Sequence, residues 1–403
     1  MSIDITLLKD LCDNFKKDIV DGPFGSNLKR EHFVDEGIPV LKIQNIKPFL
    51  LIPKNLNYVT PEKYEELKRH SYKQGDIVMT KLGNPLGASA IVTNIENGLI
   101  VADTVRIRAE KIDTKYLCYH LNSPITQDLI NSQQKGATRP RVKIANVREL
   151  PIYAPKKEKQ KQIVEILDKA FEVIDKAKEN IEKNIQNSKE LFQSRLNEIF
   201  SQKGEGWEEK TLKEVCSIIT DGTHQTPKYF DSGYTFLSSK NVTSGVIDWD
   251  NIKYIDKEQH IQMQKRVSPQ LNDVLLAKNG TTGVAAIVDR EVDFDIYVSL
   301  ALLRATEKLK PRYLLHFVNS STAKAQFNKR LKGVGVPNLH LKEIREVIIN
   351  YPIDKNEQKK IVEYIDDLTY IRNGLVDNYQ QKLKNIEELK KSILQKAFSG
   401  ELI

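Results

Sequence analysis

The chain has 403 residues, of which 40% are hydrophobic and 29% are charged, so it can form folded cores and does not have the composition of a disordered protein. Lys and Arg number 62 against 54 Asp and Glu, and the net charge of +8 favours a polyanionic partner, although any basic protein shows the same balance. Cys12, Cys118 and Cys216 are widely spaced, which predicts a cytoplasmic protein without a disulfide framework or zinc site. No apolar run is long enough for a membrane span, so we expect no membrane partner.

One pattern of residues occurs twice along the chain. Residues 75–92 read GDIVMTKLGNPLGASAIV, and residues 272–288 read NDVLLAKNGTTGVAAIV. The same alignment extends far beyond these stretches, with an upstream shift of a few residues. It pairs Asp76 with Asp273, Lys81 with Lys278, Arg148 with Arg345, and Asp21-Gly22 with Asp221-Gly222. The chain is therefore a tandem duplication, and its two copies should share one fold.

The first part of each copy has the pattern of a mixed globular domain. Residues 1–155 and 205–352 contain short β-branched runs, and Gly, Pro, Asn and Asp cluster between them, which is typical of strands joined by turns. Helical stretches occur as well. We expect the α+β fold class, with one mixed α/β globule that contains a curved β-sheet in each copy.

The second part of each copy predicts a long helix, over residues 156–204 and 353–403. Apolar residues recur there at steps of three and four, and each helix could extend for about 45 residues, roughly 65 Å. Since such a stripe is unfavourable in water, we expect the two helices to pair as an antiparallel coiled coil about a pseudo-two-fold axis between the globules. The alternative is that each helix packs on its own globule.

Motifs for catalysis are missing from the sequence. There is no Gly-Lys dipeptide, which excludes a P-loop, and there is neither Pro-Pro nor Pro-Asp, which excludes common methyltransferase and nuclease motifs. The seven histidines form neither HxxxH nor HExxH. We therefore expect a binding protein with no catalytic residue, no metal site and no cofactor of its own.

The order of globule, helix, globule and helix resembles the specificity subunit of type I restriction-modification systems over essentially the whole chain. The phrases that carry the resemblance are the helix ends SRLNEIFSQKG and KSILQKAFSGELI and the helix starts PKKEKQKQIVEILD and PIDKNEQKKIVEYIDD. The first copy departs from the second in two places, with Lys159-Gln160 in place of Glu357-Gln358 and with FSQKG in place of FSGEL. Both departures concern the helices rather than the globules.

This resemblance implies a division of labour. Each globule would be a target-recognition domain that reads one half of a split site in double-stranded DNA, and the coiled coil would set the unread spacer. The subunit would have no catalytic activity and would bind two modification subunits, which use S-adenosylmethionine to methylate adenine. With restriction subunits added, the assembly would cut DNA with ATP and Mg²⁺.

Candidate DNA-binding residues lie in turns at matching places of the two copies. Arg, Lys, Asn and Gln suit base edges, and Lys, Arg, Ser and Thr suit phosphates, although each could equally be an ordinary solvated turn residue. The candidates are Lys42, Gln44, Asn45, Lys81, Asn84, Thr138, Arg139 and Arg141 in the first copy, and Ser239, Lys240, Asn241, Lys278, Asn279, Thr281, Thr282 and Asn338 in the second.

Two further questions stay open at this point. The basic run at 156–161 is either a solvated helix start or a phosphate contact. A two-headed coiled-coil scaffold for proteins would explain the repeat and the helices, but it does not explain the basic balance or the different turns. An autonomous enzyme would need the motifs that are missing.

Overall fold

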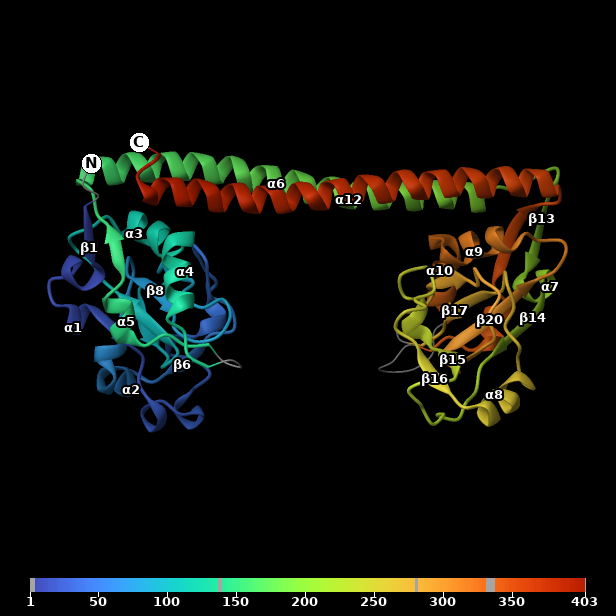
Figure 1. The fold of residues 1–403 in the computed structure, drawn as a ribbon, viewed down its shortest axis with the longest axis horizontal. Helices are drawn as coiled ribbons and strands as arrows, with labels where there is room; N and C mark the ends of the chain where they lie inside the picture. Colours follow the sequence, from blue (N-terminus) through green and yellow to red (C-terminus); the bar gives the residue numbers. More distant parts are fainter. Residues whose placement is uncertain (1–3, 137–139, 280–281, 331–337, 403) are drawn as a thin grey trace. The chain divides into compact units, whose positions relative to one another are not determined.

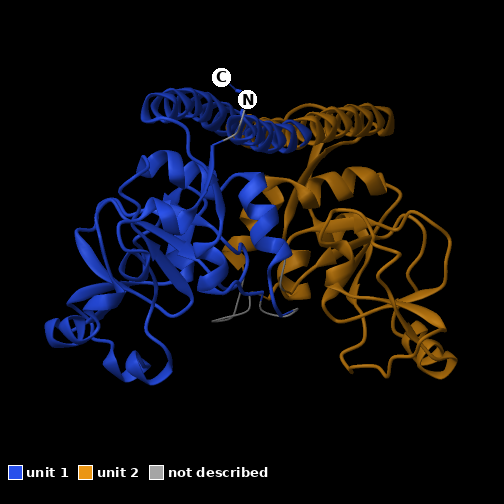
Figure 2. Cartoon of the chain, turned by 60° about the vertical axis from the view of Figure 1, so that its left-hand side comes forward, with its two compact units in different colours: residues 1–181, 381–403 blue, residues 182–380 orange. Residues whose placement is uncertain are grey.

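The computed structural model describes residues 4–136, 140–279, 282–330 and 338–402 (Figure 1). Contacts divide the chain into two compact units. Unit 1 comprises residues 1–181 and 381–403, and unit 2 comprises residues 182–380 (Figure 2). Each unit contains one globular segment and a part of both long helices, so the units are divided within the helices rather than at their ends.

Within the described part of unit 1, two four-stranded sheets form the globular segment. The neighbours in the first sheet are all antiparallel, whereas β3 and β10 of the second sheet are parallel. The first sheet has the order β2 (Ile19–Asp21), β11 (Thr104–Ile107), β8 (Ile77–Thr80), β9 (Ser89–Ile91), and the second β6 (Asn57–Val59), β3 (Ile38–Leu41), β10 (Asn97–Ile100), β7 (Ser71–Lys73). Two smaller sheets pair β1 (Ile5–Leu7) with β12 (Pro151–Tyr153) and β4 (Ile46–Lys47) with β5 (Leu50–Leu51).

Unit 2 repeats this topology, which confirms the internal duplication. Its main sheet has the order β14 (Cys216–Asp221), β20 (Leu300–Ala305), β17 (Val274–Ala277), β18 (Ala285–Ile287), matching the first sheet of unit 1 strand for strand. The other sheet has the order β16 (Lys253–Ile255), β15 (Tyr234–Leu237), β19 (Phe294–Ile296), with β15 and β19 parallel as β3 and β10 are. Strand β13 (Trp207–Thr211) pairs with β21 (Ile348–Pro352).

Short helices accompany the sheets of each unit. In unit 1 they are α1 (Phe15–Asp18), α2 (Pro61–Glu66), α3 (Thr114–Leu121), α4 (Pro124–Ser132) and α5 (Ile144–Arg148). In unit 2 they are α7 (Leu212–Val215), α8 (Lys257–Gln264), α9 (Pro311–Asn319), α10 (Ser321–Arg330) and α11 (Leu341–Arg345). Mixed helices and strands in both units confirm the α+β class.

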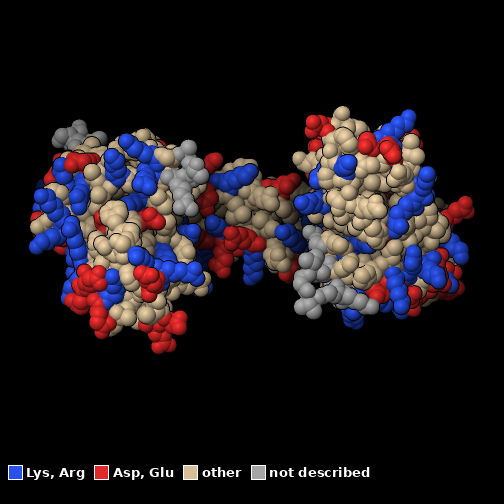
Figure 3. Space-filling view, turned by 90° about the horizontal axis from the view of Figure 1, so that it is seen from below, with Lys and Arg blue, Asp and Glu red and all other residues tan. Residues whose placement is uncertain are grey.

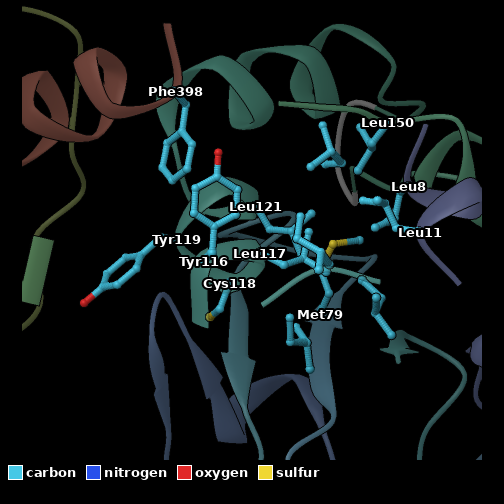
Figure 4. Close-up of a cluster of buried hydrophobic side chains, with 14 of the residues drawn as sticks. Leu8, Leu11, Met79, Tyr116, Leu117, Cys118, Tyr119, Leu121, Leu150 and Phe398 are labelled. Atoms are coloured by element: carbon cyan, nitrogen blue, oxygen red, sulfur yellow. The ribbon is translucent and has the colours of Figure 1, made fainter. Parts of the chain in front are cut away.

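Each globular core also includes the far end of a long helix. In unit 1, Phe398 packs edge-on against Tyr116 of α3, with ring centroids 5.3 Å apart, among buried side chains such as Met79 (Figure 4). In unit 2, Phe200 meets Tyr313 of α9 with the same centroid separation. These aromatic contacts attach the C-terminal end of each long helix to a globule.

The long helices are α6 (Lys157–Phe200, 44 residues) and α12 (Lys355–Ser399, 45 residues). Within unit 1, Lys178 contacts Glu387 at 3.0 Å and Lys390 contacts Asp175 at 3.2 Å, so an early part of α6 lies beside a late part of α12. Within unit 2, Arg372 lies over the ring of Phe192. The helices are therefore antiparallel partners, as predicted. No described helix is long and apolar enough to cross a membrane.

The alternative arrangement, helices packed on the globules, applies only to the helix ends. Ile163 and Leu167 of α6 belong to the core of unit 1, and Val362 and Ile365 of α12 belong to the core of unit 2. Farther along, the helices pack on each other. The apolar stripe predicted from the sequence thus serves two kinds of packing.

Candidate nucleic-acid interface

Three segments that the sequence marked separately meet in unit 1. The backbone N–H of Val101 donates to Leu41 at 3.2 Å, that of Lys81 donates to Asp103 at 2.9 Å, and that of Val142 donates to Lys81 at 3.0 Å. These bonds join the end of β3, the turn after β8 and the segment after residue 139. We name residues 42–45, 81–84, 101–103 and 140–142 the unit 1 loop cluster.

Unit 2 has the same arrangement. Tyr297 N–H donates to Leu237 at 2.9 Å, Lys278 N–H donates to Ser299 at 3.0 Å, and Leu339 N–H donates to Lys278 at 2.9 Å. Residues 238–241, 278–279, 297–299 and 338–339 form the unit 2 loop cluster. The structure therefore brings together candidates that lie up to 100 residues apart in sequence.

The lysine of each glycine turn is held by an aspartate. Lys81 Nζ lies 2.6 Å from Asp21 Oδ2, and Lys278 Nζ lies 2.5 Å from Asp221 Oδ2. The unit 2 pair is the more buried, because the exposed fractions of its side chains are 7% and 3%. Arg266 also donates to Asp221. Both lysines were predicted to contact DNA, but each is first of all the partner of a structural carboxylate.

The pKa of Asp221 shows the balance at this site. Burial by itself would raise the pKa, but the hydrogen bonds donated by Lys278 and Arg266 outweigh it and hold the pKa below its ordinary value of 3.8. The carboxylate is thus ionised at neutral pH. Since both Lys278 and Arg266 pair with it, these three side chains together keep a positive charge.

A glycine follows each of these aspartates for a steric reason. A Cβ atom at Gly22 would collide with the backbone carbonyl of Val101, and one at Gly222 would collide with that of Ile296. The close approach of the two chains needs a residue without a side chain. The glycine of each repeated Asp-Gly pair therefore lets two chain segments pack closely at the cluster.

Asn45 and Asn241 have structural positions as well. The Asn45 side chain is 1% exposed, accepts from the N–H of Lys42 at 2.9 Å, and donates to the carbonyls of Ile52 and Lys54, both at 2.9 Å. Asn241 accepts from Ser238 N–H and donates to Asp248 and Asn251 in the same way. With both amide N–H groups used inside the protein, neither asparagine has a donor left for a base edge.

The remaining candidates differ in exposure. Lys42 is half-buried, donates to Asn57 Oδ1 at 2.6 Å, and has its pKa lowered by burial. The exposed candidates are Gln44, Asn84, Arg141 and Lys240, and the partly exposed ones are Ser239, Asn279, Thr282 and Asn338. Thr138, Arg139 and Thr281 lie outside the described residues.

Sequence reasoning missed one aromatic ring beside each cluster. Phe24 is 65% exposed beside Lys81, whose Nζ lies 5.1 Å from the ring centroid, and Phe24 and Arg141 line the same pocket of about 370 Å³. His224 occupies the matching place in unit 2 and contacts Asp221. The signal was available, because each ring stands two residues after the repeated Asp-Gly pair.

Metal ligands do not gather in either cluster. Across the described ranges, no group of three or more His, Cys, Asp and Glu side chains is placed to hold a metal ion. What the clusters offer instead is amide, guanidinium, ammonium and aromatic groups on loops, which suit base edges, phosphates and base stacking.

The comparisons with known proteins agree on one family. The family model for the type I restriction modification DNA specificity domain matches residues 31–187 and 204–385. The EcoBI specificity subunit of Escherichia coli is 25% identical over 202 residues, which are 49% of this chain and 42% of that subunit. The EcoKI specificity subunit of E. coli strain K12 is 25% identical over 316 residues, 73% of this chain and 67% of that one. The match to the EcoBI subunit thus spans less than half of its length.

Solved structures show the same fold. A chain from a study of complex assembly and conformational transition in a type I R-M system aligns with a TM-score of 0.75 at 20% identity and covers 99% of this chain and 98% of its own. The HsdS subunit from Thermoanaerobacter tengcongensis aligns with a TM-score of 0.56 at 20% identity, covering 99% and 97%. With the family model matching most of its length in two copies, the chain belongs to the type I restriction modification DNA specificity family.

Proposed function

We propose that this chain is a non-catalytic DNA-recognition subunit, in which each loop cluster reads one half of a split site in double-stranded DNA and the paired helices set the spacer. The observation that carries the proposal is that the two clusters share their internal bonds but differ in their exposed side chains. Shared internal bonds keep the backbone in place, and different exposed groups give different hydrogen-bond patterns toward base edges.

The contrast between the clusters is specific. Unit 1 exposes Gln44 where unit 2 exposes Lys240, and Phe24 of unit 1 corresponds to His224 of unit 2. A protein whose two copies only held the fold together would need neither difference. This pattern favours two recognition surfaces for unlike sequences.

Docking of partner subunits is supported by apolar side chains exposed on the long helices. Ile166 and Val173 of α6 lie in unit 1 together with Leu389 of α12, and they are 40%, 69% and 50% exposed. The corresponding positions in unit 2 are also apolar and exposed: Tyr364, Ile371 and Leu191.

The spacing places these side chains on one face. Ile166 and Val173 of α6 in unit 1 are seven residues apart, as are Tyr364 and Ile371 of α12 in unit 2, and seven residues are close to two helical turns. Exposed apolar groups in such a row suit a protein partner. We therefore propose one docking face in each unit, for two modification subunits that supply S-adenosylmethionine, and further restriction subunits that supply ATP and Mg²⁺.

Arg141→Ala tests the recognition surface. Arg141 is exposed in the unit 1 loop cluster beside Phe24, so its removal should weaken binding to the mapped DNA site by about 1–3 kcal/mol and relax the choice of base at one position of one half-site. The measurement is fluorescence anisotropy with a labelled duplex, followed by sequencing of the duplexes selected from a randomised pool.

The matched control is Lys169→Ala, which removes an exposed cation from α6 and should leave the selected sequence unchanged. If Arg141→Ala selects the same bases with the same affinity, Arg141 does not read DNA. If the wild-type chain selects no sequence and instead binds proteins through both loop clusters, the scaffold alternative replaces the proposed function.

A further inference from the structure

A second polar pocket of unit 1 lies apart from the loop cluster. It has a volume of about 520 Å³, and six of its seven lining residues are cations: Lys16, Lys17, Lys68, Arg69, Arg106 and Arg108, with Ser71 as the seventh. We name it the basic pocket. Lys17 precedes β2, whereas Asp21 ends β2 inside the loop cluster network, so the two sites lie near opposite ends of one short strand. Lys and Arg gather on the left-hand side of unit 1 in Figure 3, the side on which α1 lies in Figure 1.

Arg106 is the unusual member of the pocket. It is 4% exposed, and on β11 it stands between Val105 and Ile107, which point into the core on the opposite face of the sheet. Its side chain donates to the carbonyl of Lys17 at 2.7 Å, but its Nε has no hydrogen-bond partner among the described residues. Burial, together with the neighbouring Arg108, lowers the pKa of Arg106.

The other arginine of the pocket behaves differently. Arg108 forms two hydrogen bonds of 2.8 Å to the carboxylate of Asp76, so its charge is balanced within the fold. Among the described residues no ion pair joins Arg106 to a carboxylate, although its side chain is almost fully buried, and Asp76 and Asp18 act on its charge only through space. A buried cation without a directly paired carboxylate costs free energy unless something else compensates it.

Unit 2 shows that the fold does not require these cations. In unit 1, Arg106 of β11 lies opposite Val20 and Val78 on the neighbouring strands. In unit 2, Leu302 of β20 lies opposite Thr220 and Leu275 on the matching strands, so Leu302 occupies the position of Arg106. The same alignment sets Arg304 and Asp273 in place of Arg108 and Asp76, and their ion pair is preserved at 2.7 Å.

Other positions of the basic pocket change in unit 2 as well. The ring Nδ1 of His70 donates a hydrogen bond to the carbonyl of Asp21, and Arg266 donates one to the carbonyl of Asp221. His70 and Arg266 therefore correspond, which aligns Lys68 with Gln264. Lys17 corresponds to Ser217. Unit 2 therefore folds in the same way with most of the pocket's charge replaced.

We propose that the basic pocket binds a phosphate of the DNA backbone next to the half-site that unit 1 reads. The proposal rests on the proposed function. A phosphodiester supplies the negative charge and the acceptor oxygens that Arg106 lacks, and exposed Lys16, Lys17 and Arg69 would surround it. Strand β2 has three residues, about 10 Å, so the pocket and the loop cluster would contact the same turn of DNA, which is about 34 Å long.

Arg106→Leu is the direct test, because Leu302 shows that this fold accepts leucine at the position. Binding of the full chain to labelled duplexes is measured by anisotropy at several salt concentrations. Arg106→Leu should reduce the slope of log affinity against log salt by about 0.9, the value for one phosphate, and should weaken binding to specific and unrelated duplexes by the same factor. Lys391→Ala, which removes an exposed cation from α12, is the charge control and should leave the slope unchanged.

Three outcomes decide the proposal. An unchanged slope in folded Arg106→Leu overturns it, and so does a loss confined to the specific duplex, which would indicate base reading. If Arg106→Leu does not fold, Lys16→Ala/Lys17→Ala at the exposed rim takes its place under the same criteria.

A second measurement distinguishes binding of inorganic phosphate from binding of a DNA phosphate. Thermal unfolding of wild type and Arg106→Leu is compared in potassium phosphate and in potassium chloride of equal ionic strength. Stabilisation by inorganic phosphate that Arg106→Leu loses, with no change in DNA binding, overturns the DNA assignment and indicates a small phosphate ligand. A wild-type chain that binds no DNA overturns the proposed function, and the phosphate measurement then judges the pocket alone.

Discussion

Asp221 combines two cationic partners at a site that is almost closed to water. Its side chain is 3% exposed and its carboxylate lies 2.5 Å from both Lys278 Nζ and the Arg266 guanidinium. Its depressed pKa means that the folded state binds the proton less readily than the unfolded state. The stability that it contributes is therefore complete above the ordinary pKa of 3.8 and is lost as the pH falls through the lower value of the folded state.

Asp221→Ala should lower the free energy of unfolding by about 3–5 kcal/mol, because it leaves Lys278 buried without a counter-charge. Urea unfolding measures the change. Asp21→Ala is the matched variant in unit 1 and should cost less, since Asp21 and Lys81 are 17% and 14% exposed. Replacing both partners, as Asp221→Ala/Lys278→Met, should recover part of the loss, and an equal loss in the double variant would contradict the ion-pair explanation.

His120 makes the stability of unit 1 depend on pH in the acidic range. Its Nε2 accepts from the N–H of Tyr153 at 3.0 Å, so the ring must be neutral there, and burial lowers its pKa from 6.5 to about 3. Between these values the unfolded state binds one proton more than the folded state. The unfolding free energy should therefore rise with pH by up to about 1.4 kcal/mol per unit across this window and should reach its full value above pH 6.5.

His120→Gln keeps an acceptor for Tyr153 and removes the titrating ring, so it should flatten this pH dependence in urea unfolding between pH 4 and 7. His340→Gln is the control, because His340 is exposed. A pH slope that survives in His120→Gln would assign the dependence to another group.

For single residues, the sequence indicated where in the fold a side chain lies better than which contacts it makes. Lys278 and Asn241 were predicted to bind DNA, and the structure places both in the unit 2 loop cluster. Lys278 has its carboxylate partner, Asp221, in a segment that is distant along the chain, so only the fold brings the pair together, whereas Asn241 bonds to residues close to it in sequence. Phe24 was missed because an apolar residue in a turn gives no polar signal. Its repeated position after Asp-Gly was the available evidence.

The two long helices begin in the same way in both copies, with a buried glutamine in the first turn. Gln358 of α12 is fully buried, accepts from the N–H of Lys310 at 2.9 Å, and donates to the carbonyls of Lys308 and Pro352 at 2.9 and 2.8 Å. Gln160 of α6 makes two corresponding bonds in unit 1, accepting from the N–H of Asp113 and donating to the carbonyl of Pro155. The glutamine, which both copies contain, attaches each helix to its globule.

Gln358→Ala should lower the free energy of unfolding by about 1–3 kcal/mol, because it leaves a buried N–H and two carbonyls without their partner. Gln380→Ala, an exposed position on the same helix, controls for the intrinsic helix preference of the new residue and should change little. Hydrogen exchange at the Lys310 amide provides the local readout, and unchanged protection there would contradict the assigned role.

The long helices could be predicted because apolar residues at steps of three and four over more than forty positions fit only a helix, whatever that helix packs against. The sheets could be predicted only as a class, since short runs such as DIVMT identify a strand but not its neighbours. The pairing of β2 with β11 joins segments more than 80 residues apart, and it is set by core packing that no local pattern encodes.

Duplication of the whole chain makes a prediction about the DNA site. The scaffold bonds of the loop clusters repeat, with Asp21 and Lys81 matched by Asp221 and Lys278, whereas the exposed groups do not repeat. Equal scaffolds with unlike exposed side chains should bind unlike base sequences, because each base pair presents its own donor and acceptor pattern in the major groove. The split site is thus expected to have two different halves.

Mapping adenine methylation in the source genome, with and without this gene, measures that site directly. Replacing Lys240 by Gln, the residue at the matching place in unit 1, should alter the bases of one half only and leave the other half and the spacer unchanged. Gln380→Ala on α12, outside both clusters, should alter neither half. A palindromic site, or a change in both halves from Lys240→Gln, would contradict the assignment of one half to each unit.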